Sequence, residues 1–300
     1  MKVLITGATG FVGRNLGEFL LSGGFEVEAL SLRNIGWQNK VFNAKAIIHL
    51  AGKAHDTANS SNPENYFLVN RDLTIQVFEK FLNSEVEDFF YFSSVKAVAD
   101  SFEGILTEDY QGNPLTPYGK SKFEAEQYLM SKELPKGKRL FIIRPCMIHG
   151  PGNKGNLNLL YALVKKGLPW PLGAFDNRRS FLNIINLNFL ILSMLEKKDL
   201  KSGIFNFADD RAISTNELIS IISTVLNKKI STLSLNRKLI EKIVKISDFF
   251  NLPINSERLK KLTESYVVSN SKIKNELGIN ELPVSVENGL IKTIQSFYIK

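Results

Sequence analysis

The sequence predicts an α/β protein with a doubly wound parallel sheet and a smaller C-terminal lobe. Its first segment, "KVLITGATGFVGRNLGEFLLSGGFEVEAL", reads as strand, glycine turn, helix, glycine stop and strand, which is the order of a nucleotide-binding βαβ unit. The later apolar runs "KAIIHLAG" and "EDFFYFSS" are typical of strands that helices cover on both faces. Together these runs indicate a parallel sheet rather than an antiparallel one.

The composition is that of an ordinary globular protein. The 300 residues are 44% hydrophobic and 23% charged, which is enough for one large core with a smaller lobe. The net charge of +8 suits a small anionic ligand such as a nucleotide diphosphate as well as nucleic acid. Because the basic residues are spread along the chain without the aromatic residues of a single-strand platform, we expect no nucleic-acid partner.

Cysteine usage and hydropathy bear on the compartment. Cys146 is the only cysteine, so no intrachain disulfide can form, and a reducing compartment, the cytoplasm, is favoured. The N-terminal apolar run is too short for a signal peptide. The run "FLNIINLNFLILSML" is interrupted by asparagines and predicts a buried helix, so we expect no membrane insertion.

Three glycines follow the first strand at the spacing G-x-x-G-x-x-G. Gly7 permits a tight turn, Gly10 lets the backbone approach a pyrophosphate, and Gly13 allows the helix to pack closely on the strand. The helix N-terminus then offers unpaired N–H groups to the anion. Set between a strand and a helix, this loop predicts a dinucleotide site; a purely structural turn is the alternative.

The stretch "ALSLRN", residues 29 to 34, closes the second strand without the acidic residue that usually binds the adenosine ribose. An acid there would bond the ribose 2′-hydroxyl and repel a 2′-phosphate, whereas Ser31 with the nearby Arg33 favours the phosphate. We therefore expect NADP(H) in preference to NAD(H). The alternative is that Arg33 points to solvent.

The connection after the second strand is short. Only residues 34 to 44 separate Arg33 from the next strand, whereas a full βαβ unit needs about 30 residues or more. The sequence therefore predicts that one helix-plus-strand unit is missing, and that Trp37, Val41 and Phe42 cover the exposed edge. The loss would also remove a familiar adenine contact.

A serine, a tyrosine and a lysine follow the fourth predicted strand. Thr116 and Pro117 are expected to begin a helix, which places Tyr118 and Lys122 on one helical face. The ammonium is expected to lower the phenol pKa from about 10, so that the tyrosine can exchange a proton with a sugar hydroxyl or carbonyl. Ser94 could donate a second hydrogen bond to the same oxygen. The alternative, a surface tyrosine and a solvated lysine, is disfavoured by the glycine loop.

The motifs "GATGFVG", "HLAG", "SSVKAVAD", "YGKSK" and "RPCMIHGPG" resemble those of the extended short-chain dehydrogenase/reductase family, the NAD-dependent epimerases, dehydratases and reductases of nucleotide sugars. The resemblance implies a Rossmann-type fold, a homodimer, and action of Ser94, Tyr118 and Lys122 on a sugar hydroxyl or ketone. It also makes Asn70 a structural residue. Ser31 and Arg33 are expected cofactor contacts from the end of the second strand. Together with those that the resemblance implies, the full set is Gly7, Gly10, Phe11, Val12, Gly13, Ser31, Arg33, Leu50, Ala51, Gly52, Lys122 and Pro145.

The resemblance extends to the substrate side. It implies that Arg179, in "RRSFLNIINL", contacts the substrate diphosphate and that Asn156 binds a UDP-sugar. Arg258 is a second candidate for the diphosphate, since a guanidinium suits bidentate phosphate binding. A surface ion pair remains the alternative for each arginine. With Ser94 and Tyr118 these residues make up the expected substrate site, and no metal is expected.

Two departures from the family pattern narrow the reaction. The 4,6-dehydratases of the family need a carboxylate pair after the catalytic serine or threonine, but Val95 and Lys96 stand there. No cysteine follows Ser94, as 3,5-epimerising relatives require. We interpret Cys146 as a small core residue and His149 as structural. The remaining reactions are reduction of a 4-ketone and 4-epimerisation, which use the same three residues.

The resemblance to reductases of UDP-N-acetyl-6-deoxyhexosamine synthesis, together with the expected NADPH, favours reduction. We expect the chain to reduce the C4 ketone of a UDP-4-keto-6-deoxy-N-acetylhexosamine for surface polysaccharide synthesis. The alternative is a UDP-hexose 4-epimerase acting on UDP-glucose or UDP-N-acetylglucosamine. A non-catalytic nucleotide-sensing or RNA-binding protein is a distant third, because Tyr118 and Lys122 are both present.

The expected division of the chain follows from the same pattern. Residues 1–150 with about 176–210 are expected to form the NAD(P)-binding domain. Residues 151–175 and 211–300 are expected to form the substrate-binding lobe, with the helix in "ISTNELISIISTVLNKK" capped by Ser214.

Overall fold

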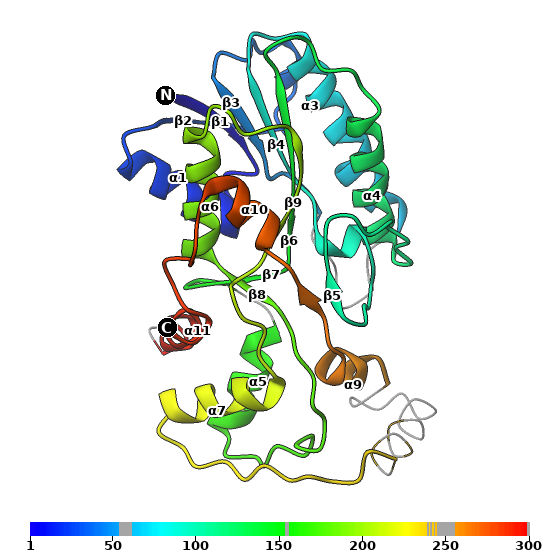
Figure 1. The fold of residues 1–300 in the computed structure, drawn as a ribbon, viewed down its shortest axis with the longest axis vertical. Coiled ribbons are helices and arrows are strands. Elements are labelled where there is room, and N and C mark those ends of the chain that lie inside the picture. Colours follow the sequence, from blue (N-terminus) through cyan, green and yellow to red (C-terminus); the bar gives the residue numbers. More distant parts are fainter. Residues whose placement is uncertain are drawn as a thin grey trace.

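The computed structural model describes residues 1–53, 62–153, 156–238 and 256–298, together with residues 240, 242 and 244. At its centre is a six-stranded sheet in the order β2-β1-β3-β4-β6-β9 (Figure 1). Each neighbouring pair of strands is parallel. The six strands are β1 (Lys2–Thr6), β2 (Glu26–Leu30), β3 (Ala46–His49), β4 (Asp88–Phe92), β6 (Arg139–Pro145) and β9 (Gly203–Phe207).

Helices cover both faces of the sheet (Figure 1). Side chains alternate along each strand: Val3 and Ile5 pack in one core cluster and Leu4 packs in the other. The strands are continuously apolar because both faces are buried, and the predicted doubly wound α/β fold is confirmed. One face carries α1 (Phe11–Ser22), α6 (Ile184–Glu196) and α10 (Ser271–Leu277), and the other carries α3 (Leu73–Leu82) and α4 (Pro117–Met130).

The unit after β2 is missing, as predicted. Residues 31–45 lead from β2 to β3 with a single 3-10 turn, Trp37–Asn39, and β2 is the edge of the sheet. Trp37 and Phe42 are buried in the core cluster on the side of α3. Val41, in contrast, is 80% exposed, so the prediction that it covers the edge is wrong. Of the adjacent residues Val41 and Phe42, only Phe42 turns toward the core.

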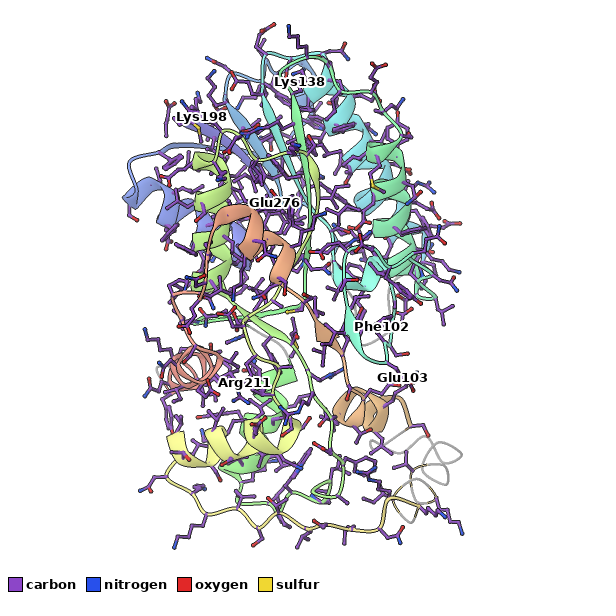
Figure 2. All side chains as sticks on the ribbon, viewed as in Figure 1. Phe102, Glu103, Lys138, Lys198, Arg211 and Glu276 are labelled. Atoms are coloured by element: carbon purple, nitrogen blue, oxygen red, sulfur yellow. The ribbon has the colours of Figure 1, made fainter. Side chains whose placement is uncertain are left out.

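A third hydrophobic cluster lies away from the sheet, among helices that include α5 and α7, which are drawn below the sheet in Figure 1. Arg211, labelled in Figure 2, follows β9 and pairs with Glu217 and Glu287, which lie on two helices of this lobe. Ser214 caps the first of these helices in a capping box with Glu217, as expected. The elements around this core are β7 (Met147–His149), α5 (Asn156–Lys165), β8 (Phe181–Asn183), α7 (Thr215–Val225), α9 (Ser256–Thr263) and α11 (Val286–Gln295).

One part of the C-terminal third returns to the sheet. Strand β10 (Val267–Val268) pairs with β5 (Ile105–Leu106), and Tyr266, Ile273 and Leu282 pack in the core cluster of α1 and α6. Residues assigned to the lobe from sequence therefore contact the larger core, while the proposed division at 150, 176 and 210 stays a prediction. Among the described residues, no helix has the length and apolar character needed to cross a bilayer.

A buried ion pair fastens α4 to the sheet. The Arg144 guanidinium on β6 donates from Nε to Glu126 Oε1 at 3.0 Å and from Nη2 to Glu126 Oε2 at 2.5 Å. The two side chains are 3% and 0% exposed. Because a desolvated charge is stable only beside its partner, this pair makes the position of α4 relative to β6 costly to change.

We expect Glu126→Gln to destabilise the fold by about 3–5 kcal/mol, because it leaves the Arg144 charge buried without its counter-ion. Chemical unfolding followed by circular dichroism measures the loss. The control is Glu87→Gln, which breaks the exposed Lys45–Glu87 pair and should leave stability unchanged. Equal losses in the two variants would contradict the role given to the buried pair.

Candidate active site

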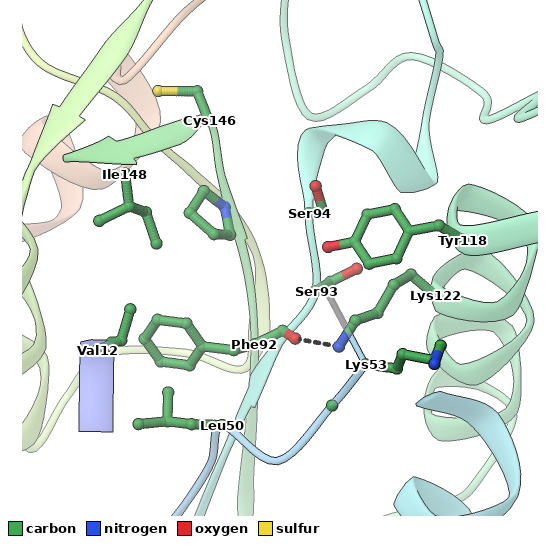
Figure 3. A pocket seen from close by; sticks show the side chains of 12 residues that line it. Val12, Leu50, Lys53, Phe92, Ser93, Ser94, Tyr118, Lys122, Cys146 and Ile148 are labelled. Carbon is green, nitrogen blue, oxygen red and sulfur yellow. Dashed lines mark hydrogen bonds between the residues drawn. The ribbon is translucent and has the colours of Figure 1, made fainter. Parts of the chain in front are cut away.

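A cavity of about 260 Å³ opens at the carboxyl ends of the central strands (Figure 3). This is where ligands of parallel α/β sheets bind. Val12, which lies between Gly10 and Gly13, reaches the cavity from one side, and Tyr118 and Lys122 reach it from α4. Seven of the residues predicted from sequence line it, namely Val12, Leu50, Gly52, Ser94, Tyr118, Lys122 and Pro145.

The start of α4 sets the position of the tyrosine and the lysine. Thr116 is the N-cap, with its hydroxyl accepting the Gly119 N–H at 3.2 Å, and Pro117 is the first helical residue. Tyr118 and Lys122 therefore lie on successive turns of one face, as predicted, and both reach the cavity. The Lys122 ammonium donates to the Phe92 carbonyl at 2.8 Å, which ties the helix to the end of β4 (Figure 3).

Ser94 is oriented by its own backbone turn. It caps the 3-10 helix Val95–Ala97, and its Oγ accepts the Lys96 N–H at 3.1 Å. Since a hydroxyl has one proton to give, accepting this bond leaves the Ser94 proton available for the cavity. Ser94 hydrogen-bonds the Tyr118 phenol there. The turn after β4 thus aims a donor at the tyrosine oxygen.

Burial is the largest influence on the pKa values of Lys122 and Tyr118. It lowers the pKa of Lys122 from 10.5 to about 8, against the opposing attraction of Glu126. It also raises the pKa of Tyr118 above 10.0, although the hydrogen bond from Ser94 acts in the other direction. The expectation that Lys122 lowers the phenol pKa is therefore wrong for the free protein: desolvation disfavours the phenolate, and Tyr118 is a phenol at neutral pH.

The glycine loop fits a dinucleotide. Gly7 has φ +70°, and a Cβ on Gly13 would lie 2.4 Å from the Gly7 carbonyl oxygen. No side chain caps the N-terminus of α1, so its N–H groups are available to a diphosphate. A Cβ on Gly52 would lie 3.0 Å from Asn70 Oδ1 and 3.2 Å from Lys122 Nζ, so the wall beside the lysine is closely packed. Val12, Leu50 and Pro145 add the apolar surface that a nicotinamide ring would need.

The other predicted cofactor contacts lie outside the cavity wall. Phe11 begins α1 and is half-buried, and the Ala51 N–H donates to Thr6 Oγ1 at 3.1 Å. Ser31 and Arg33 are exposed in the segment after β2. Their exposure leaves both side chains accessible to a ligand, and their role stays a prediction.

The predicted substrate contacts are only partly brought together. Ser94 and Tyr118 share the cavity, but Arg179 is half-buried outside its wall, where its backbone pairs with Ile213 and Tyr266. Asn156 and Arg258 belong to α5 and α9, and their side chains lie outside the described part of the structure. Asn70, predicted to be structural, bonds both backbone groups of Lys53.

Five lining residues were not predicted as site residues. All lie at or within a few residues of the carboxyl end of β3, β4 or β6, which is the signal that could have found them. Cys146 was interpreted as a core residue; it is 7% exposed, and burial raises the pKa of its thiol well above 9.0. His149 is fully buried and bonded to Thr293, in keeping with a structural role. No group of three potential metal ligands occurs within the described residues. The five lining residues outside the predicted set are Lys53, Phe92, Ser93, Cys146 and Ile148.

Comparison with known proteins points to one family. Residues 3–208 match the model of the NAD dependent epimerase/dehydratase family. The chain is 29% identical to the UDP-glucose 4-epimerase of Vibrio cholerae over 99% of this chain and 95% of the relative. It is 28% identical to the N-acetyl-alpha-D-glucosaminyl-diphospho-ditrans,octacis-undecaprenol 4-epimerase of Escherichia coli O157:H7, over 78% and 75%. The GDP-6-deoxy-D-mannose reductase of Pseudomonas aeruginosa is 23% identical, over 75% and 80%.

Solved structures share the fold over the whole chain. RMD from Pseudomonas aeruginosa, complexed with NADPH, superposes with a TM-score of 0.75 at 18% identity, covering 100% of this chain and 99% of that one. The UDP-glucuronic acid 4-epimerase of Bacillus cereus, in complex with NAD, gives 0.76 at 18% identity with the same coverage. These similarities confirm the Rossmann-type fold.

The glycine loop yields a test of the dinucleotide site. Gly13→Ala places a methyl group 2.4 Å from the Gly7 carbonyl oxygen, so the loop must move. We expect binding of NADPH and NADH, measured by nucleotide fluorescence, to weaken about tenfold or more, a loss of about 1.4 kcal/mol.

The matched control on the same helix is Gly17→Ala, where the new methyl group meets only Val27 Cγ1 at 4.0 Å. It should bind nucleotide normally and gain about 0.5–1 kcal/mol of stability, because alanine favours the helix. Normal nucleotide binding by Gly13→Ala would show that the cofactor does not sit on this loop.

Proposed function

Since the chain belongs to the NAD-dependent epimerase/dehydratase family, we propose that it is a nucleotide-sugar oxidoreductase that reduces the C4 ketone of a UDP-4-keto-6-deoxy-N-acetylhexosamine. The observation that carries this proposal is the position of the Tyr118 phenol, which lines the cavity beside Ser94 and whose pKa is raised by burial. Reduction of a ketone needs a proton donor next to the developing alkoxide, and a phenol that burial keeps protonated meets that need.

The chain's own residues supply the proton and hold the oxygen. A nicotinamide cofactor, when bound, would supply the hydride for the new C4–H bond. Tyr118 gives its proton to the C4 oxygen, so the ketone becomes a hydroxyl group and the tyrosine becomes a phenolate. Ser94 donates a hydrogen bond to the same oxygen, which stabilises the negative charge as it develops.

Lys122 balances the charge that Tyr118 acquires. Its ammonium is held by the Phe92 carbonyl at the cavity wall, and a positive charge there stabilises the phenolate. The same ammonium can hydrogen-bond a ribose hydroxyl, the role implied by the family resemblance. Its pKa of about 8 in the free protein means that the charge is present at neutral pH.

NADP(H) is the cofactor we propose in preference to NAD(H). The end of β2 carries no acid, and both Ser31 and Arg33 are exposed there, which favours a 2′-phosphate. Both cofactors occur among structural neighbours of this fold, since one was solved with NADPH and another with NAD. Exchangeable NADPH suits a reductase, because each turnover consumes one hydride.

Dehydration of the sugar is disfavoured by the residues after Ser94. Val95 is 4% exposed and apolar, and the Lys96 ammonium is occupied by the Asp100 carbonyl. Neither side chain can act as the acid or base of an elimination.

A UDP-hexose 4-epimerase is the second candidate. It is favoured by the Vibrio cholerae relative, a UDP-glucose 4-epimerase similar over nearly the whole chain. The same serine, tyrosine and lysine would act in that reaction, with tyrosine removing a proton in the first half and returning one in the second.

Three further proposals rest on the family resemblance. We propose that Arg179, Arg258 and Asn156 bind the UDP moiety, that the chain forms a homodimer through α4 and the helix near Asn70, and that it serves surface polysaccharide synthesis in the cytoplasm.

The reaction is tested with UDP-4-keto-6-deoxy-N-acetylhexosamine, prepared in situ by a 4,6-dehydratase, with NADPH and NADH in parallel. We expect one NADPH to be oxidised for each 4-hydroxy sugar formed, followed by nicotinamide absorbance and product analysis. No net oxidation, with UDP-glucose or UDP-N-acetylglucosamine interconverting at C4, would establish the epimerase instead.

The tyrosine is tested in the same assay. Tyr118→Phe should lose about 10²- to 10⁴-fold in turnover, the typical contribution of a general acid. The control on the same helix is Tyr128→Phe, because Tyr128 bonds Glu79 outside the cavity and should keep full activity. A nucleotide-sensing protein would be indifferent to both changes.

The pKa of Lys122 predicts how kcat/KM changes at alkaline pH. Lys122 is protonated below its pKa of about 8 and loses its charge above it, while Tyr118 stays a phenol through this range because its pKa is raised. We therefore expect kcat/KM, which reports the free enzyme, to fall as pH rises through about 8. Lys122→Arg should keep its charge and lose this limb. A wild-type profile that stays flat to pH 10 would contradict the assignment.

A further inference from the structure

Ser93 carries an unused hydroxyl at the wall of the cavity. Its N–H donates to the Ile143 carbonyl at 2.8 Å, so the backbone still belongs to the sheet where β4 ends. The side chain is 5% exposed, and its Oγ has no hydrogen-bond partner within the described residues. Figure 3 shows this hydroxyl between the side chains of Tyr118 and Lys122.

The neighbouring polar groups of the cavity are already engaged. Ser94 Oγ accepts a backbone N–H, and the Lys122 ammonium donates to the Phe92 carbonyl. Ser93 Oγ differs from them, because both its proton and its lone pairs are unpaired in the described structure. Its surroundings otherwise restrain it, since the sheet holds its backbone and neighbouring side chains bury it.

A buried hydroxyl without a partner destabilises the protein that contains it. An alanine would fill the same place in the strand end without that cost. The hydroxyl is therefore unfavourable in the free protein and becomes favourable only when something in the cavity pairs with it. Ser93 is one of the residues that line the cavity, and its hydroxyl lies between the Tyr118 and Lys122 side chains (Figure 3), so a ligand bound beside these two residues would come close to it.

We propose that Ser93 is a ligand-binding residue whose Oγ hydrogen-bonds a hydroxyl or carbonyl group of the bound ligand. The inference deepens the proposed function, on which it rests for the identity of the two ligands. The partner group belongs either to the nicotinamide-ribose half of the cofactor, on the side of Lys122, or to the sugar, on the side of Tyr118. Both present hydroxyl and carbonyl groups, and the experiment separates them.

The test is Ser93→Ala, compared with wild type in three measurements. Thermal unfolding of the free protein should occur at the same or a higher temperature, because no hydrogen bond is lost. Affinity should fall about three- to tenfold, the effect of one hydrogen bond, for one of two probes. NADPH binding is measured by fluorescence, and UDP-N-acetylglucosamine binding by calorimetry on the nucleotide-saturated protein.

The matched control is Ser84→Ala at the opposite end of the sheet. Ser84 Oγ donates to the Phe81 carbonyl at 2.8 Å and accepts the Val86 N–H at 3.2 Å. Its removal should lower the unfolding temperature and leave both affinities unchanged, which is the reverse of the pattern expected for Ser93.

Weaker NADPH binding by Ser93→Ala assigns the hydroxyl to the cofactor, and weaker sugar-nucleotide binding alone assigns it to the sugar. Unchanged affinity for both probes overturns the inference, as does an equal loss of affinity in Ser84→Ala, which would trace the effect to stability. Failure of the wild type to bind NADPH or NADH would instead contradict the proposed function.

Discussion

The hydrogen bond from the Lys122 ammonium to the Phe92 carbonyl is the contact on which the rest of the site depends. It joins α4 to the end of β4 and holds a positive charge in a buried position. Tyr118, Lys122 and Glu126 stand four residues apart on one face of α4, so a phenol, an ammonium and a carboxylate follow one another along a line. Glu126 stabilises the lysine charge through its own field and is itself fixed by Arg144. The position of the tyrosine is therefore set by a chain of charges that reaches back into the sheet.

The two halves of the proposed dinucleotide site are built on different principles. The half at the cavity is buried and formed by residues that the sheet holds in place, with glycines where a Cβ would collide. The other half lies after β2, which is the edge strand of the sheet because the next unit is missing. Ser31 and Arg33 are exposed there. Trp37 and Phe42 are buried in the core behind this segment. Affinity for a cofactor should accordingly rest more on the glycine loop and the cavity than on the adenosine end.

Local signals made much of this predictable from sequence. The glycine loop, the Thr116 cap and the helical spacing of Tyr118 and Lys122 each depend on a few neighbouring residues, and each was found as expected. Properties that depend on distant packing were not predictable. The Tyr118 pKa is raised because other elements bury the phenol, and periodicity carries no measure of that burial. Arg179 stands outside the cavity wall because its backbone pairs with Ile213 and Tyr266, which are far from it in the sequence. Val41 and Phe42 are indistinguishable as apolar neighbours until the fold turns one of them inward.

The protonation state of Tyr118 also bears on the direction of the chemistry. A 4-epimerase begins by removing a proton from a sugar hydroxyl, so its tyrosine must start as a phenolate. A ketone reductase begins with the proton on the phenol and gives it away. In this chain burial raises the phenol pKa, and the nearby ammonium is engaged by the Phe92 carbonyl. The hydrogen bond from Ser94 opposes the shift without reversing it. Since both reactions use the same three residues, the proposal of reduction rests on this balance between desolvation and charge rather than on the identity of the residues.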